Sequence, residues 1–307
     1  MAPIRGLTLL GAPSNIGIRP YDDGRLRALD RAPALLRTRG LMARIGAKDL
    51  GDVHPPAYED FVRPPRYVRN ETPLVQYSGA LAERIANAGA HGDFVVLIGG
   101  DCSIVVGATM GASRLVGDRA VGLAYVDAHA DFATEEESYT GSAASMCLAM
   151  VAGHGNTALA RMAGASPLVR PTDIALVGRR DEGEPYGHAA LRPLGVHDVP
   201  YADVRSQGIE RTVAEVTAIL TKADLAGFWI HVDADVLDES IMPAVDSPTP
   251  DGPGLDDLVA LVAPLVRHPR ALGMQLTIYD PGLDPDGACA ELLVTFLEQT
   301  LAGGPTS

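Results

Sequence analysis

The chain has 307 residues, and 47% of them are hydrophobic, which is enough apolar material for a large core. Its net charge of −14 argues against nucleic acid and anionic membrane surfaces as partners, because both repel an acidic protein. The 3 cysteines have no CxxC spacing and indicate no disulfide framework. We find neither a signal peptide nor a membrane-spanning run, so we expect a cytoplasmic protein.

Short apolar runs of strand type alternate with longer runs of helical spacing along the chain. The expected strands are 7–10, 94–98, 121–126, 174–178, 228–232 and 274–279. The expected helices are 25–45, 74–90, 104–115, one that begins at 143, 209–221, 255–266 and 291–301. This alternation predicts an α/β fold, a three-layer αβα sandwich with a mainly parallel sheet, in a single domain over residues 1–307.

Polar motifs directly follow three stretches of the chain that we expect to be strands. Residues 99–103 read Gly-Gly-Asp-Cys-Ser, and residues 127–131 read Asp-Ala-His-Ala-Asp. Residues 233–238 read Asp-Ala-Asp-Val-Leu-Asp. In parallel sheets, ligands bind beyond the carboxyl ends of the strands, where all three motifs are expected.

Two-residue spacing gives these motifs the character of a metal site. It points Asp127, His129 and Asp131 to one side of an extended segment, and Asp233 and Asp235 have the same spacing. Gathered carboxylates are costly to bury unless a cation lies between them. The motifs therefore predict a pair of divalent metal ions, although each motif taken alone is also typical of turns and helix caps.

The ordered motifs, with Pro243-Ala244 downstream, resemble the ureohydrolase family, which includes arginases, agmatinases and formimidoylglutamases. The resemblance extends from Gly11-Ala12-Pro13 to Tyr279-Asp280-Pro281. It implies an arginase-like hydrolase that cleaves a non-peptide C–N bond of an amidine, guanidino or ureido-type small molecule with a metal-activated hydroxide. It also implies a homo-oligomer, trimeric or hexameric.

The same resemblance implies a set of metal ligands for two divalent ions, most commonly manganese. Asp127 and Asp233 would bridge the ions, His129 with Asp235 would complete one side, and Asp131 the other. Cys102 stands where the family has its first histidine ligand. A thiolate favours zinc, iron or cobalt; in the alternative interpretation Cys102 is a buried, unreactive thiol beside a weakened site.

One departure from the family concerns recognition of the substrate's guanidinium group. Ile278 occupies the place of the glutamate that holds the substrate's guanidinium in the family. A guanidinium buried against isoleucine would be an unpaired charge. Asp280 or Gln275 are the possible replacements, and strand periodicity puts only Asp280 on the face of Ile278. We expect catalytic roles for Asp280 and, in addition to its ligand role, for Asp131.

A second departure concerns proton transfer. Ala144 falls where many arginases have a histidine thought to relay protons, and His154 is a possible substitute further along. The resemblance also assigns substrate-tail contacts to a loop that contains Ser138, Thr140 and Ser142. The run 135–137 of three glutamates is either a solvated face or a partner for an amine-bearing tail.

The segment after the strand at 174–178 is a further candidate for substrate contacts. Asp181, Glu182 and Glu184 resemble the family segment that meets the amino end of the substrate. The alternative is a charged surface loop.

The chain retains the metal ligands but lacks the glutamate that binds the guanidinium, and this combination allows two interpretations. One is a hydrolase whose substrate has a neutral C–N centre, such as an amide, ureido or imidate group, or an amidine held differently. The other is a diverged non-catalytic or single-metal member with a binding role. Clustered carboxylates without metal would repel one another, which favours the enzyme. A deacetylase of the related fold is disfavoured, because we find no tandem catalytic histidines.

Overall fold

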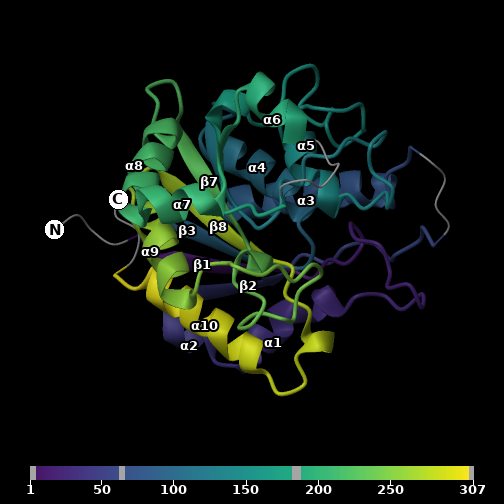
Figure 1. Ribbon diagram of the computed structural model, residues 1–307, viewed down its shortest axis with the longest axis horizontal. Coiled ribbons are helices and arrows are strands. Elements are labelled where there is room, and N and C mark those ends of the chain that lie inside the picture. Colours follow the sequence, from purple (N-terminus) through teal and green to yellow (C-terminus); the bar gives the residue numbers. More distant parts are fainter. Residues whose placement is uncertain (1–4, 62–65, 182–187, 304–307) are drawn as a thin grey trace.

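The computed structural model describes residues 5–61, 66–181 and 188–303, which form one eight-stranded sheet covered by helices (Figure 1). The strand order is β2-β1-β3-β8-β7-β4-β5-β6, and every pairing of the described strands is parallel. The predicted three-layer α/β sandwich is confirmed. The strands are β1 (Leu7–Ala12), β2 (Lys48–Asp52), β3 (Phe94–Gly99), β4 (Val121–Val126), β5 (Ile174–Val177), β6 (His197–Val199), β7 (Gly227–Asp233) and β8 (Ala271–Thr277).

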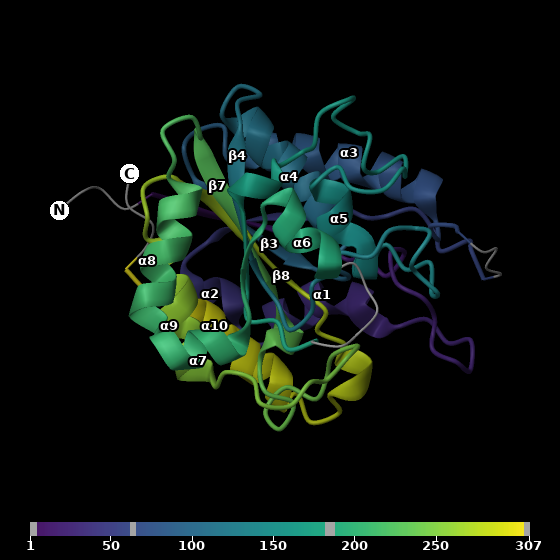
Figure 2. The ribbon, with the colours of Figure 1, turned by 45° about the horizontal axis from the view of Figure 1, so that its top comes forward.

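Helices pack on both faces of the sheet (Figure 2). One layer contains α3 (Glu71–Ala88), α4 (Ile104–Leu115) and α5 (Cys147–Val151). The other layer contains α1 (Ala32–Thr38), α2 (Leu41–Ile45), α8 (Ile209–Leu220), α9 (Leu255–Val266) and α10 (Ala288–Leu301). Helix α6 (His188–Leu194) contacts β6, and α7 (Tyr201–Gln207) contacts α8. Among the described helices, none is long and apolar enough to cross a membrane.

The central strands were predictable because both of their faces are covered. Every residue of β3, β4 and β7 is buried, and strands buried on both faces are near-continuous apolar runs. The edge strands β2 and β6 have no such run, since β2 reads Lys-Asp-Leu-Gly-Asp and β6 has three residues. For this reason the sequence did not reveal either edge strand. The short helices α6 and α7 were also not predicted.

The prediction of one long helix over 25–45 is wrong. The structure has the 3-10 helix η1 (Ala28–Arg31), then α1 and α2, with Gly40 between the two α-helices in the left-handed conformation at φ 80°. Glycine adopts this conformation without the steric cost of a Cβ atom, so it ends one helix and reorients the next.

The Gly-Gly-Asp-Cys-Ser turn joins β3 to α4 and is locked to the N-terminal loop by Asp101. Its carboxylate accepts hydrogen bonds from Ser14 Oγ at 2.7 Å, Gly17 N at 3.1 Å and Ser103 N at 3.0 Å. A Cβ atom at Gly100 would lie 1.7 Å from the Ser14 carbonyl oxygen, so only glycine fits there. The carboxyl ends of β3, β8, β7 and β4 are adjacent in the sheet, and this turn places Cys102 at that edge.

Candidate metal centre and substrate pocket

Two overlapping groups of potential metal ligands lie at the carboxyl ends of the central strands. Within each group the donor atoms are all within 4.8 Å of one another. Asp127 belongs to both, so the groups form one continuous acidic centre of the kind that the sequence predicted. The first group is Asp127, His129 and Asp235, and the second is Cys102, Asp127, His231 and Asp233.

Two equivalent turns place these carboxylates. Asp127 follows β4 and accepts a hydrogen bond from the backbone N–H of His129 at 2.7 Å. Asp233 ends β7, pairs with β8, and accepts one from the backbone N–H of Asp235 at 2.8 Å. Each turn fixes the first carboxylate and projects the side chain two residues later toward the same centre. The spacing seen in the sequence is therefore realised by turns as well as by extended backbone.

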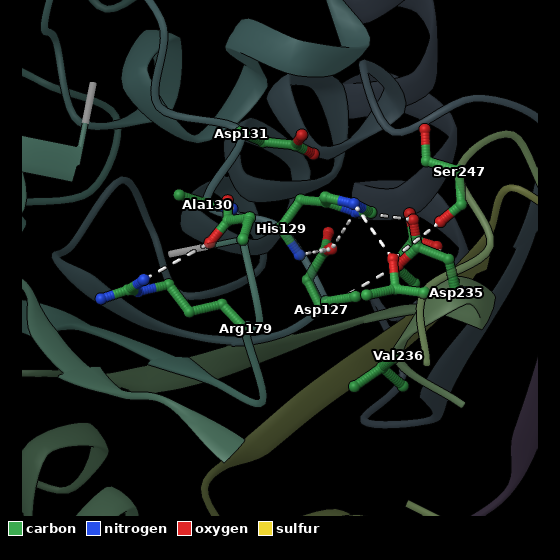
Figure 3. A network of polar contacts seen from close by, with 12 residues as sticks. Asp127, His129, Ala130, Asp131, Arg179, Asp235, Val236 and Ser247 are labelled. Carbon is green, nitrogen blue, oxygen red and sulfur yellow. Dashed lines mark hydrogen bonds and ion pairs between the residues drawn. The ribbon is translucent and has the colours of Figure 1, made fainter. Parts of the chain in front are cut away.

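His129 lies between two carboxylates, as Figure 3 shows. Its Nδ1 is 2.9 Å from Asp235 Oδ2 and 3.7 Å from Asp127 Oδ1, and Thr249 Oγ1 is 3.4 Å from its Nε2. Burial lowers the pKa of His129, but the charges of Asp235 and Asp127 raise it more, so the net pKa is well above its usual value. No pattern in the sequence singled out Thr249.

Burial and mutual repulsion dominate the electrostatics of the centre. Burial raises the pKa of Asp127 to about 7, and the charge of Asp235 adds to the increase. Burial, with the charges of Asp235 and Asp127, raises the pKa of Asp233 well above its usual range. Burial would also raise the pKa of Asp235, but His129 outweighs it and the net pKa is lowered. Such a centre is stabilised by added positive charge.

The donor atoms fit a divalent cation. Asp127 Oδ2 is buried and has no hydrogen-bond partner in the part of the chain that the structure describes. A buried carboxylate oxygen without a partner is costly unless a cation binds it. Carboxylates with an imidazole form a donor set that suits manganese. The residues at positions 127, 129 and 235 therefore fit the group that the sequence implied.

Cys102 is buried at the second donor group. Its Sγ donates a hydrogen bond to Asp233 Oδ2 at 2.5 Å and lies 3.3 Å from Thr277 Oγ1. Burial, followed by the charge of Asp233, raises the pKa of the Cys102 thiol well above its usual value. Without a cation the residue is therefore a thiol, and a bound cation would favour the thiolate.

Asp131, which the resemblance implied as a metal ligand, belongs to neither donor group. Its Oδ2 accepts a hydrogen bond from Tyr125 OH at 2.6 Å, and Cys147 Sγ lies 3.6 Å away. The residue has φ 47°, a left-handed conformation that aspartate tolerates. In Figure 3 no dashed line joins Asp131 to Asp127, His129 or Asp235. The structure thus places Asp131 at the pocket, but outside the two groups.

A pocket of about 550 Å³ opens above the centre. The predicted substrate residues Ser138, Thr140 and Ser142 line it, together with Ala144. Their hydroxyls are held by the backbone: Ser138 Oγ accepts from Gly141 N at 3.0 Å, and Thr140 Oγ1 accepts from Ser142 N at 3.1 Å. The structure brings these residues together with the metal-ligand candidates in one pocket lining, and their contact with a substrate stays a prediction.

Asp181 also lines the pocket, but its carboxylate is occupied. Its Oδ2 accepts from the backbone N–H of Ala130 and faces His188 Nε2, both at 2.8 Å. Burial would raise the pKa of Asp181, but the His188 contact and the Ala130 hydrogen bond outweigh it and lower the pKa. Glu182 and Glu184 lie outside the described residues.

Ile278 lines the pocket with a backbone conformation that is rare for a β-branched residue. It is 4% exposed and has φ 68°. Strand β8 ends at Thr277, so the two-residue periodicity does not extend through Ile278. A non-glycine residue in this region stores backbone strain, which is typical of functional sites.

The expectation that Asp280 shares the face of Ile278 is wrong, because the left-handed backbone at 278 breaks the strand pattern. Asp280 is not among the residues that line the pocket. Its carboxylate accepts hydrogen bonds from Tyr21 OH at 2.6 Å, Ala28 N at 3.3 Å and Gly282 N at 2.7 Å. These contacts fix the loops beside the site and give Asp280 a structural role.

The remaining candidates also lie outside the pocket lining. Gln275 is fully buried between Trp229 and His231. His154 stacks on Phe132. In the glutamate run 135–137, Glu136 and Glu137 are exposed, which supports a solvated face for these two residues. Glu135 is partly buried, and its carboxylate accepts a hydrogen bond from Asn156 N at 2.9 Å.

Residues at the centre that the sequence did not reveal include His231 and Asp246. His231 lies within β7, and a polar residue in an otherwise apolar strand was the available signal. Asp246 lines the pocket and forms an ion pair with Arg27, which also lines it. No spacing in the sequence connects these two.

An α/β sandwich with this acidic centre at its central strand ends has the architecture of a metallohydrolase. The model of the arginase family matches residues 15–303. The chain therefore belongs to the arginase family of ureohydrolases, whose members are hydrolases of non-peptide C–N bonds.

Individual relatives agree with this assignment. The chain is 28% identical to the arginase of Bacillus caldovelox over 253 residues, 80% of this chain and 81% of the relative. It is 25% identical to the arginase of Staphylococcus aureus (strain COL), over 98% of this chain and all of the relative's length (100%). The solved structure of the Bacillus caldovelox arginase superposes with a TM-score of 0.83 at 25% identity, covering 97% of this chain and 98% of that one.

Proposed function

We propose that the protein is a binuclear metal hydrolase that cleaves a C–N bond in a small molecule of the amidine, guanidino or ureido type. The observation that carries the proposal is the centre around Asp127, whose unpartnered Oδ2 lies within a buried group of carboxylates and an imidazole. The similarity to arginases supports the reaction type.

The proposed ligands follow the two donor groups. Asp127, His129 and Asp235 would hold one ion, and Cys102, Asp127 and Asp233 would hold the other. Divalent ions, of which manganese is the family's usual choice, supply the Lewis acidity that lowers the pKa of water and stabilises negative charge when they are bound. Because Cys102 offers a thiolate, zinc, iron and cobalt are alternatives to manganese for the ion on its side.

Asp131 is our candidate for the general acid that protonates the leaving nitrogen. Tyr125 OH holds its Oδ2, which leaves Oδ1 outside this contact and orients the carboxylate. The position of the family's relay histidine is occupied here by Ala144, which has no proton to give. A carboxylate at the pocket can take over this role if it is protonated when the substrate binds.

The pocket wall formed by Ile278 restricts the reacting group. A guanidinium against this side chain would be buried without a partner, which costs several kcal/mol. We propose that the substrate has a neutral C–N centre, such as an amide, ureido or imidate group, or an amidine held by another carboxylate. Asp246 is such a carboxylate, although Arg27 already pairs with it.

Substrate-tail contacts are assigned to the loop with Ser138, Thr140 and Ser142, and to Asp181, which lines the same pocket. Arg19 lines the pocket and pairs at 2.5 Å with Asp22, whose side chain is 89% exposed. A pair with so exposed a partner is weak, so the Arg19 guanidinium is available to a carboxylate on the tail. Homo-oligomeric assembly and a cytoplasmic location stay predictions.

The second candidate function is binding without catalysis, or with a single metal ion. Two observations favour it: Ile278 lines the pocket where a carboxylate was expected, and Asp131 lies outside the two donor groups.

The deciding experiment measures metal content by elemental analysis, then hydrolysis after loading with manganese, zinc, iron or cobalt. The substrate panel contains arginine, agmatine, guanidino acids, formimidoylglutamate, and ureido and amide compounds. Turnover of a non-guanidinium substrate with two ions per chain is the expected result. Tight binding of a panel compound without turnover in any metal form would instead establish the second candidate.

A further inference from the structure

His231 is a fully buried histidine whose Nε2 has no hydrogen-bond partner among the residues described. It lies 3.7 Å from Asp127 Oδ2, which is likewise buried and unpartnered. Buried polar atoms nearly always have a partner. Two such atoms that face each other, within a group completed by Cys102 and Asp233, indicate a ligand that both can bind.

We propose that His231 replaces the histidine that the family has at position 102 and, with Cys102, Asp127 and Asp233, binds one of the two cations. This inference rests on the proposed metal-dependent function and deepens it by assigning the donor set of one ion. It also explains how the chain tolerates cysteine at position 102: the imidazole comes from the neighbouring strand β7.

The sheet fixes the direction of the His231 ring. Tyr125, His231 and Gln275 are partners in the register of β4, β7 and β8, so their side chains form one row beneath the centre. The rings of Tyr125 and His231 are stacked, with centroids 4.0 Å apart and an interplanar angle of 12°. Because the ring is packed on one side by Tyr125, its Nε2 remains aimed at the carboxylates.

The two sides of the centre then have different chemistry. The side of His129 offers an imidazole and carboxylates, which suits manganese. The side of His231 adds the sulfur of Cys102, a softer ligand that suits zinc, cobalt(II) or iron(II). We therefore expect two unlike sites, and a mixed-metal centre when both kinds of ion are present.

Gln275 controls which nitrogen of His231 carries the proton. The indole N–H of Trp229 can only donate, and it donates to Gln275 Oε1 at 3.0 Å. The Gln275 amide nitrogen lies 2.8 Å from His231 Nδ1 and donates to it, which leaves the ring proton on Nε2. Cation binding through Nε2 requires the proton on Nδ1. The amide of Gln275 must then rotate so that its oxygen accepts from Nδ1, and it loses its hydrogen bond with the indole N–H of Trp229.

The test begins with cobalt(II) titrated into metal-free wild-type protein and followed by absorption spectroscopy. We expect two ions per chain and a thiolate-to-cobalt charge-transfer band that disappears in Cys102→Ser. A wild-type protein that binds cobalt without this band would overturn the proposal.

His231→Gln and His129→Gln form a matched pair, since each removes one imidazole from one side of the same centre. His231→Gln should weaken one cobalt site by more than about tenfold and shift or abolish the thiolate band. His129→Gln should weaken the other site and preserve the band. An unchanged band and two unchanged affinities in folded His231→Gln would show that His231 is not a ligand.

Gln275→Glu keeps the proposal testable if His231→Gln does not fold. A carboxylate can accept from Trp229 N–H and from His231 Nδ1–H together, which places the free lone pair on Nε2. We expect tighter cobalt binding at the thiolate site, and weaker or equal binding would contradict the assignment.

The outcomes also separate this proposal from the proposed function. Cobalt bound through Cys102 and His231 without turnover of any panel compound would leave the ligand assignment standing and refute the hydrolase. If His231→Gln leaves both hydrolysis and metal content unchanged, the hydrolase proposal stands and the ligand assignment of His231 is refuted.

Discussion

The carboxyl ends of β7 and β8 lie side by side in the sheet but have different roles. At the end of β7, a tight turn projects Asp233 and Asp235 into the acidic centre. At the end of β8, Ile278 leaves the strand with φ 68° and presents a branched apolar side chain to the same pocket. Under the proposed function, one strand end would hold cations and the next would shape the substrate space, so the reacting group could change while the metal centre is retained.

The largest expected effect comes from removing a ligand at the β4 and β7 ends. Outer contacts of metal ligands typically contribute about 10- to 100-fold to affinity or activity, so Asp127→Asn should lower kcat/KM by more than about 100-fold. Elemental analysis should show fewer than two ions per chain. Asp286→Asn, at an exposed position, is the matched control. A normal metal content in Asp127→Asn would contradict the ligand assignment.

At the β8 end, Ile278→Glu should add a partner for a guanidinium. A hydrogen bond to a charged group contributes about 1.5–3 kcal/mol, so we expect kcat/KM for agmatine or arginine to rise by roughly 10- to 100-fold relative to wild type. Ile278→Gln matches the size without the charge and should give a smaller gain. If both variants leave guanidino compounds untouched, Ile278 does not determine specificity.

Without bound metal, the folded protein should become less stable as the pH rises. The ordinary pKa of Asp127 is 3.8 and its folded pKa is about 7. The contribution of protonated Asp127 to the stability of the folded protein is fully present below pH 3.8. It is lost as the pH rises through about 7. Asp233 acts in the same direction, whereas Asp235, with its lowered pKa, opposes them.

We therefore expect the Tm of chelator-treated protein to fall between about pH 5 and 8, because the buried centre then gains negative charge. Reloading with divalent cations should remove most of this fall. Differential scanning fluorimetry across the two states measures it. A Tm of the stripped protein that rises over this interval would mean that the carboxylates do not repel one another as described.

The smallest effect concerns Asp280, beyond the β8 end. Asp280→Asn should weaken its contacts with Tyr21, Ala28 and Gly282, at a cost of about 1–3 kcal/mol. The Tm should fall by several degrees, while kcat changes less than about threefold, as expected for a structural residue. A large loss of kcat at unchanged Tm would restore the catalytic role that the sequence suggested.

The sequence revealed the parts of this molecule in which local pattern and tertiary context agree. Continuous apolar runs identified β3, β4 and β7, and the spacing of Asp127, His129, Asp233 and Asp235 identified the acidic centre. Edge strands were missed because they need no apolar run when one side faces solvent.

Other features depend on backbone geometry and on pairing between strands. The left-handed conformation of Ile278 has no sequence signal, and it invalidated the periodicity that linked Asp280 to the pocket. His231 is beside Asp127 only because β7 pairs with β4 in a particular register. A single histidine inside a buried strand does not reveal that register.

The carboxylate of Asp101 has a mechanical consequence. It fastens the N-terminal loop at Ser14 and Gly17 to the turn that contains Cys102. That loop continues to Arg19 on the pocket wall, so this wall cannot open without pulling on the floor of the centre. The loop that contains Ser138, Thr140 and Ser142 is tied to the same N-terminal loop, because Ser142 Oγ accepts from Arg19 N at 2.9 Å and Ala144 N donates to Gly17 O at 3.0 Å. A movement of either loop would therefore be passed to the turn that contains Cys102.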